Sequence, residues 1–271
     1  AHELNNPIGF IYSNMTHLRD YSEKLIQLVK VAEETPTQLT TKKEEFEVPA
    51  MSEYLPLEPG KFIVYRVDST VFINVNTVLA VHSYQMKLQV DAQITDNLGR
   101  PSYRVYRYIR DKNGTQPWAI DGSFSITMLP DQVELTDDNQ RIIKLHAPLR
   151  EGFTWKGNRY LPDNPYGGIF SFSIDDDMKE WDFYYDLFSD FSYDGNNYAD
   201  VLTVEQVDES TNLPIQPNYT IASRERSVEK YARGIGLVYR EYYLWEYQNN
   251  SSSVAPTYTG FGITSWMISH N

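Results

Sequence analysis

The pattern of apolar and polar residues changes twice along the chain. In residues 1–34 apolar residues recur every three or four positions, which predicts an amphipathic helix. From residue 54 to residue 248 the period becomes two, which is typical of strands that are buried on one face. We therefore expect four regions: a helix over 1–34, a polar linker over 35–53, a β domain over 54–248, and a tail over 249–271 that includes a candidate last strand.

The predicted N-terminal helix carries a heptad seam in which seven of eight positions are apolar. Pro7 lies inside the pattern, so the helix begins or kinks there. Two arrangements fit the seam equally well. One is docking onto the chain's own core. The other is a homodimer in which two copies of the helix pair through Ile8, Ile11, Met15, Leu18 and Leu25.

The clearest strand covers residues 84–95, where apolar and polar residues alternate strictly. Its apolar side consists of Tyr84, Met86, Leu88, Val90, Ala92 and Ile94. Turn signals follow at residues 97–101 and at Asn113-Gly114. Further candidate strands are 62–68, 71–76, 102–110, 123–129, 141–147, 169–174, 200–207, 219–231 and 235–247. Because no helical pattern separates these segments, we predict a mainly β fold, either an antiparallel sandwich or a barrel-like sheet.

Composition narrows the function classes. The 271 residues include 24 Lys and Arg against 37 Asp and Glu, a net charge of −13, which argues against a nucleic-acid partner. No apolar run is long enough for a transmembrane helix, so we expect no membrane span. The absence of cysteine excludes disulfides, thiolate zinc sites and cysteine nucleophiles. The histidines have no metal-ligand spacing, so we expect neither a metal nor a cofactor.

Residues 1–10 read Ala-His-Glu-Leu-Asn-Asn-Pro-Ile-Gly-Phe and resemble the H-box of sensor histidine kinases. The resemblance extends over residues 1–34. It implies that His2 accepts a phosphoryl group, that Glu3 accepts the proton of His2, and that Asn6 orients the phosphate. On a helix, His2 and Asn6 project from the same face because they are four residues apart. No motif of an ATP-binding lobe follows, so no autonomous kinase activity is expected.

Three sequence segments of the β region resemble uncharacterised cell-envelope lipoproteins of Bacteroidetes-type bacteria. They are Tyr54-Leu-Pro-Leu-Glu-Pro-Gly-Lys-Phe-Ile-Val-Tyr-Arg-Val-Asp-Ser, Leu149-Arg-Glu-Gly-Phe-Thr-Trp-Lys-Gly-Asn and Tyr231-Ala-Arg-Gly-Ile-Gly-Leu-Val-Tyr-Arg-Glu. The resemblance covers residues 54–248 and implies an extracytoplasmic domain, in the periplasm or on the cell surface. Histidine kinase helices work in the cytoplasm, so the two resemblances imply different compartments for one chain.

Residues 54–248 form the larger of the two regions and supply the leading hypothesis. On this hypothesis the chain is an exported β domain with a non-enzymatic binding or structural role. Its partner would be a glycan or another envelope protein. The alternative is a fragment of a two-component phosphorelay, with a response regulator as its partner. A glycan hydrolase with paired carboxylates is a third hypothesis, but the sequence nominates no pair.

An aromatic-rich segment with interleaved acids supplies the candidate ligand contacts. Trp155, Trp181, Tyr184 and Tyr185 are suited to stacking on sugar rings if they are exposed. The competing interpretation is that these rings pack in the core of the sheet. The nearby run Asp175-Asp176-Asp177 is more simply a solvated acidic turn than a Ca²⁺ site, because it lacks EF-hand spacing.

Overall fold

The computed structural model describes residues 49–172, 178–186, 188–249 and 255–271. The chain divides into two compact units, residues 1–47 and 48–271, and the described residues belong to the second unit. The predictions for the N-terminal helix, its dimer seam and the residues His2, Glu3 and Asn6 lie outside the described residues. The phosphorelay hypothesis therefore stays a prediction. The acidic run 175–177 also lies outside them.

The described residues are mainly β, as the sequence predicts. The strands are β1 (Phe62–Ile73), β2 (Val78–Thr95), β3 (Pro101–Asp111), β4 (Ala119–Met128), β5 (Gln132–Asp137), β6 (Gln140–His146), β7 (Thr154–Trp155), β8 (Phe183–Tyr185), β9 (Ser189–Tyr193), β10 (Asn196–Thr211), β11 (Ile221–Ala232), β12 (Gly236–Gln248) and β13 (Thr257–His270). Helical structure here is limited to α2 (Met51–Tyr54) and the 3₁₀ turn η1 (Met178–Glu180). No helix within the described ranges has the length and apolar character needed to cross a membrane.

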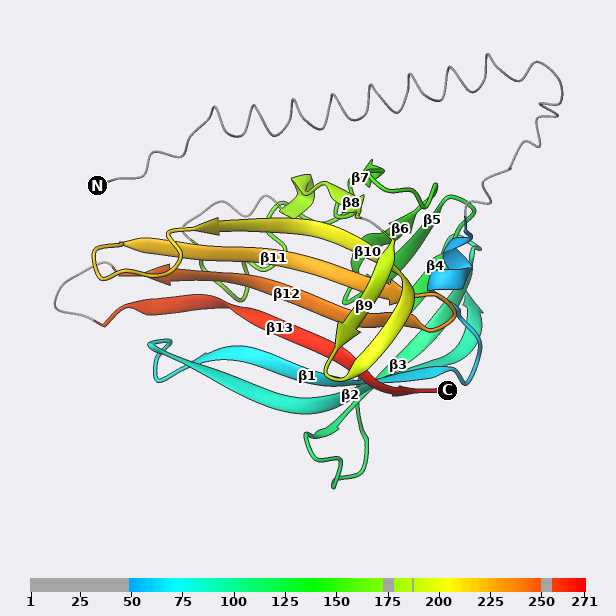
Figure 1. Cartoon of the computed structure of the whole chain (residues 1–271), viewed down its shortest axis with the longest axis horizontal. Helices are drawn as coiled ribbons and strands as arrows, with labels where there is room; N and C mark the ends of the chain where they lie inside the picture. Colours follow the sequence, from blue (N-terminus) through cyan, green and yellow to red (C-terminus); the bar gives the residue numbers. More distant parts are fainter. Residues whose placement is uncertain (1–48, 173–177, 187, 250–254) are drawn as a thin grey trace, which may run out of the picture. The chain divides into compact units, whose positions relative to one another are not determined.

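All thirteen strands belong to one antiparallel sheet, in the order β6-β5-β4-β3-β2-β1-β13-β12-β11-β10-β8-β7, with β9 paired to β10 (Figure 1). Most neighbours are consecutive hairpins. There are two exceptions: β8 pairs with β10, and β13 pairs with β1 on one side and β12 on the other. The C-terminal tail therefore provides a strand in the middle of the sheet, and the β domain extends well beyond residue 248.

The sheet curls until its two ends meet. The backbone N–H of Ile143 in β6 donates to the carbonyl of Gly157, which follows β7, at 2.9 Å. The indole Nε1 of Trp155 in β7 donates to the carbonyl of Ile143 at 3.0 Å. These bonds link the first and last strands of the sheet order. Of the two architectures that the sequence allowed, the structure is therefore the barrel-like one.

The alternation predicted for residues 84–95 holds only in its first part. From Tyr84 to Val90 the apolar residues line the inside of the sheet. A β-bulge at Asp91 then shifts the register, so that Ala92 pairs with Arg104, whose guanidinium lies outside on Asp91. Ala92 and Ile94 consequently face outward, because one extra residue reverses every later side chain.

Two candidate strands differ from the structure. The predicted strand 71–76 is not separate, since residues 71–73 continue β1 and residues 74–76 form the turn that follows it. Residues 169–172, the described part of the predicted strand 169–174, form no strand. The backbone N–H groups of Ile169 and Phe170 both donate to the carbonyl of Tyr166, at 2.8 and 2.9 Å, and this turn replaces ladder pairing. The segment belongs to the long connection between β7 and β8.

Candidate functional site

The inner face of the curled sheet borders a cavity of about 820 Å³. Much of its wall is apolar, because most of the inward-facing residues of β1 to β5 and of β13 are apolar. Examples are Val67, Met86, Leu88, Val105, Ile126 and Ile263. A cavity of this size falls within the range of about 300–1,000 Å³ that is typical of small-molecule sites.

A buried carboxylate, Glu229 of β11, is the centre of a polar cluster on this wall, with only 1% of its surface exposed. Its Oε1 accepts a hydrogen bond from Lys144 Nζ and lies 3.3 Å from Arg240 Nε. Its Oε2 accepts a hydrogen bond from the Tyr231 hydroxyl at 2.7 Å. Arg240 is the direct partner of Glu229 in the β11–β12 ladder, so the two side chains share the inner face. Lys144 reaches the cluster from β6, across the interior.

The cluster carries one negative and two positive charges, so its formal net charge is +1. Burial by itself would raise the pKa of Glu229. The attraction of Lys144 and Arg240 and the hydrogen bonds from Lys144 and Tyr231 outweigh it, so the pKa lies below its ordinary value. Burial lowers the pKa of Lys144, and the attraction of Glu229 opposes that shift. A single carboxylate thus neutralises only one of the two positive charges. The cluster keeps one positive charge that can pair with a second anion.

Two buried hydrogen-bond donors also line the cavity. Gln206 is 6% exposed and Trp181 is 5% exposed. Gln206 Oε1 accepts a hydrogen bond from the Ser227 hydroxyl at 2.7 Å, which orients the amide. Within the described part of the chain, neither Gln206 Nε2 nor Trp181 Nε1 has a hydrogen-bond acceptor. A buried donor without an acceptor costs about 1–3 kcal/mol, so both atoms favour a ligand that supplies oxygen atoms.

A second group of charges lies at the rim of the cavity and has the opposite sign. Arg107 of β3 donates to Asp121 of β4 at 2.6 Å and to Asp137 of β5 at 2.8 Å. Asp138 also borders the cavity here. These side chains are partly exposed, whereas Glu229 and Lys144 are buried. The cavity therefore combines a buried basic cluster with a solvated acidic rim.

The aromatic residues predicted to bind a ligand do not share one face. Trp155 and Tyr185 are buried, and their ring centroids lie 4.6 Å apart. For these two rings the core-packing interpretation holds. Trp181 lines the cavity, and Tyr184 lies on the opposite side of β8 from Tyr185, since neighbours in a strand alternate. Glycan binding by these residues stays a prediction.

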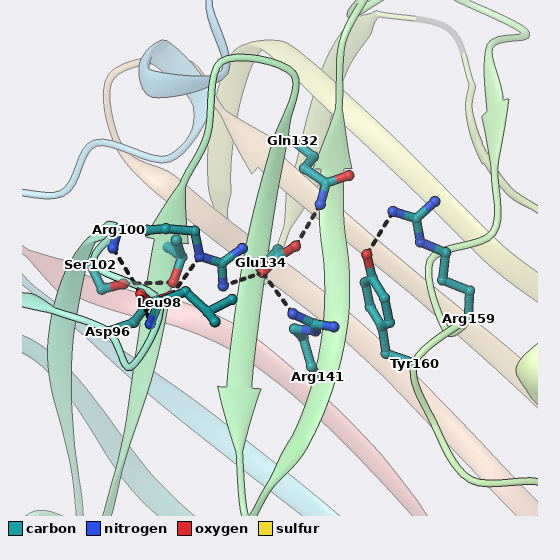
Figure 2. Close-up of polar contacts among 10 residues, drawn as sticks. Asp96, Leu98, Arg100, Ser102, Gln132, Glu134, Arg141, Arg159 and Tyr160 are labelled. Atoms are coloured by element: carbon teal, nitrogen blue, oxygen red, sulfur yellow. Dashed lines mark hydrogen bonds and ion pairs between the residues drawn. The ribbon is translucent and has the colours of Figure 1, made fainter.

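A second buried carboxylate lies on the outer face of the sheet (Figure 2). Glu134 of β5 is 2% exposed and accepts a hydrogen bond from Gln132 Nε2 at 2.5 Å. Its Oε2 lies 3.0 Å from Arg100 Nη2 and 3.7 Å from Arg141 Nη1. Arg141 in turn lies over the ring of Tyr160, 3.6 Å from the centroid. Protein side chains thus surround this carboxylate, and its role is to tie the β2–β3 turn to β5 and β6.

No protein-family model matches the sequence, and neither does any curated protein. Among solved structures the chain is similar to a "putative exported protein with YmcC-like fold" from Bacteroides fragilis NCTC 9343. The identity is 11%, the match covers 80% of this chain and 97% of that chain, and the TM-score is 0.32. A "putative lipoprotein" from Parabacteroides distasonis ATCC 8503 gives 16% identity, coverage of 77% and 96%, and a TM-score of 0.36.

LprF from Mycobacterium bovis gives 10% identity, coverage of 81% and 90%, and a TM-score of 0.22. At these TM-scores the likenesses do not by themselves assign a compartment or an activity to this chain. None of the three proteins is described as a histidine kinase.

Proposed function

We propose that the β unit is a non-enzymatic binding domain of an exported envelope protein, and that its cavity holds an amphipathic anion. The apolar body of the ligand lies against the walls formed by β1 to β5 and β13. Its anionic group meets Lys144 and Arg240 and accepts hydrogen bonds from Gln206 Nε2. The observation that carries the proposal is the pair of unpartnered donors, Gln206 and Trp181, beside a net positive cluster in a largely apolar cavity.

The character of the wall favours an apolar chain over a sugar. Hydroxyl groups that face Val67, Leu88 or Ile126 would lose their hydrogen bonds to water without replacement, which is costly. An alkyl chain gains free energy in the same place, about 0.8 kcal/mol for each buried methylene group. A glycan would instead have to use the half-exposed Tyr184 or other surface groups.

The assignment to the envelope rests on the resemblance of residues 54–248 to cell-envelope lipoproteins. Fractionation of the cells that make the protein tests it. We expect the protein outside the cytoplasm, in the periplasmic or envelope fraction, and digestion by external protease would place it on the cell surface. Recovery in the cytoplasmic fraction alone would overturn the export part of the proposal and leave ligand binding untouched.

Fluorescence titration with dansyl-undecanoic acid tests the ligand class. We expect saturable binding, and binding of the matched neutral dansyl alcohol that is roughly tenfold weaker, since a charged hydrogen bond contributes about 1.5–3 kcal/mol. Arg240→Met is expected to weaken binding of the acid and to leave binding of the alcohol unchanged. Equal affinities of the wild type for acid and alcohol would exclude an anion site.

A pair of variants on one strand tests the location. Leu88 lines the cavity, and Gln89, the next residue of β2, faces the other side of the sheet. Leu88→Trp fills part of the cavity and is expected to abolish binding, whereas Gln89→Trp is expected to bind like the wild type. If both variants fold and bind equally well, the ligand does not occupy the cavity.

A further inference from the structure

One end of the sheet has few charged residues. The turns β1–β2 and β10–β11 and the described ends of β12 and β13 meet there, since Tyr258 N donates to Asn76 O at 2.8 Å and Gln248 pairs with both Ile221 and Thr257 (Figure 1). The sequence has no Asp, Glu, Lys or Arg in the runs 69–86, 210–223 and 247–269, although 23% of all residues are charged. The charged residues nearest to this end in β11 and β12, Arg224 and Glu246, have opposite signs, so this end has no excess of either charge in a protein of net charge −13.

The β1–β2 hairpin at this end exposes large apolar side chains. Five of the eleven exposed large hydrophobic residues in the described ranges lie within nine positions of its tip. They are Ile73, Val75, Val78, Leu79 and Val81. Apolar exposure concentrated in one projecting element marks an interaction site, whereas isolated exposed residues do not.

Both faces of the hairpin are apolar. Ile73 and Val78 are direct partners and share one face, while Phe72 and Leu79 share the other. A strand that covers a core on one side is normally polar on its second face. A protein partner would cover one of the two faces. Apolar residues on both faces instead suit a medium that surrounds the hairpin, such as the boundary between lipid headgroups and acyl chains.

Val75, at the tip of the hairpin, has a backbone conformation that is unfavourable for valine. Asn74, Val75 and Asn76 all have positive φ angles, and that of Val75 is +57°. Asparagine tolerates this left-handed region, whereas a β-branched residue is rarely found there. Val75 is nevertheless 91% exposed and makes the most prominent apolar contact surface of the turn. The fold therefore presents an apolar side chain at the apex, where asparagine or glycine would be easier to accommodate.

We propose that this neutral end of the sheet docks on a lipid bilayer and inserts the β1–β2 tip into its interfacial region. The surface would be zwitterionic, because this end has no excess of Lys or Arg with which to attract anionic lipids; its nearest arginine, Arg224, is already paired with Asp208. Trp245 and Tyr258, which are both partly exposed, pack together close by, and such aromatic rings suit the headgroup level. Insertion is shallow. Residues 78–83 of β2 extend beyond the β2–β3 ladder, and the backbone groups on their unpaired edge need hydrogen-bond partners that the hydrocarbon core does not supply.

Flotation of the full chain with phosphatidylcholine vesicles tests the proposal. We expect the wild type to float with the vesicles in high salt as well as low salt. Leu79→Asp is expected to reduce the bound fraction roughly tenfold, because the buried apolar contact is lost. The matched control is Leu98→Asp, which changes an equally apolar and 71% exposed residue of the β2–β3 turn, at the opposite end of β2, and is expected to bind like the wild type.

The absence of native cysteine allows a second measurement at single positions. A Val75→Cys variant labelled with the fluorophore NBD is expected to shift its emission to the blue when phosphatidylcholine vesicles are added, and a labelled Leu98→Cys variant is not. Equal flotation of Leu79→Asp and wild type, or no shift at position 75, would overturn the proposal. Loss of a dimer in Leu79→Asp without any vesicle binding would do the same, and would assign this end to pairing with a second copy.

Discussion

Two buried carboxylates of this protein have the same charge environment and different surroundings. Glu229 and Glu134 each lie against two cationic side chains, and each is almost fully removed from solvent. Glu134 lies on the outer face of the sheet, where Gln132 and the Arg141–Tyr160 contact fill the space around it. Glu229 borders a cavity of about 820 Å³.

The comparison shows that an ion pair alone does not identify a binding site. Around Glu134, neighbouring side chains occupy the space beside the cations. Around Glu229, the cations Lys144 and Arg240 share one carboxylate, and the donors of Gln206 and Trp181 have no acceptor within the described residues. Glu134 Oε2 is itself buried without a hydrogen bond, so an unsatisfied atom alone is not diagnostic either. What distinguishes the ligand site from the contacts around Glu134 is open volume beside unsatisfied donors.

The largest effect is expected for Glu229→Gln. This variant leaves Lys144 buried beside Arg240 without a counter-ion, and breaking a buried pair in this way costs about 3–5 kcal/mol. Urea denaturation followed by circular dichroism measures the loss of unfolding free energy. A loss below about 1 kcal/mol would mean that the cluster is hydrated rather than buried.

A smaller effect is expected for Glu134→Gln. Arg100 keeps Asp96 as a partner, with its Nε 2.6 Å from Asp96 Oδ2, and both arginines near Glu134 are partly exposed. We expect a loss of about 1–3 kcal/mol in the same denaturation experiment. Binding of dansyl-undecanoic acid should not change. Weaker binding in this variant would contradict the separation of the two carboxylates.

The acid dependence of stability is expected to differ between Glu229→Gln and the wild type. The pKa of Glu229 lies below the ordinary value of 4.5, so the unfolded chain binds more protons than the folded one as the pH falls through that window. The contribution of Glu229 to stability is thus present above pH 4.5 and is lost below it. Urea midpoints from pH 7 to pH 3 should show a flatter acid slope in Glu229→Gln than in the wild type.

Part of that slope will remain in Glu229→Gln. Hydrogen bonds from backbone N–H groups lower the pKa values of Asp96 and Asp111, which lie at turns and do not line the cavity. An acid slope that is identical in variant and wild type would show that these turns, and not the buried cluster, determine the acid sensitivity.

The sequence predicts the sheet better than the site. The strict alternation from Tyr84 to Val90 identifies an inner face, because only apolar residues occupy it. In β11, by contrast, Arg226 and Glu229 lie on opposite faces and both are charged, so a period of two does not show which face is inside. The bulge at Asp91 has no comparable signal in the residues around it.

The site also depends on closure of the sheet. Lys144 and Glu229 are 85 residues apart and come from strands that are not neighbours in the sheet. Only the curling of the sheet brings them together, and no local pattern encodes it. Trp181 is the one residue of the cavity that the sequence nominates as a ligand contact, on the basis of its aromatic surroundings.

The most direct test of the cavity as a ligand site is the set of indole N–H signals in the NMR spectrum of the labelled protein. Trp155 Nε1 and Trp266 Nε1 already donate to Ile143 O at 3.0 Å and to Asp194 at 2.9 Å, whereas Trp181 Nε1 has no acceptor in the described structure. Addition of dodecanoate is expected to move the Trp181 signal and to leave the signals of Trp155 and Trp266 in place. The Trp181 signal is assigned by its loss in Trp181→Phe. A Trp181 signal that stays fixed while dodecanoate saturates the protein would contradict the account.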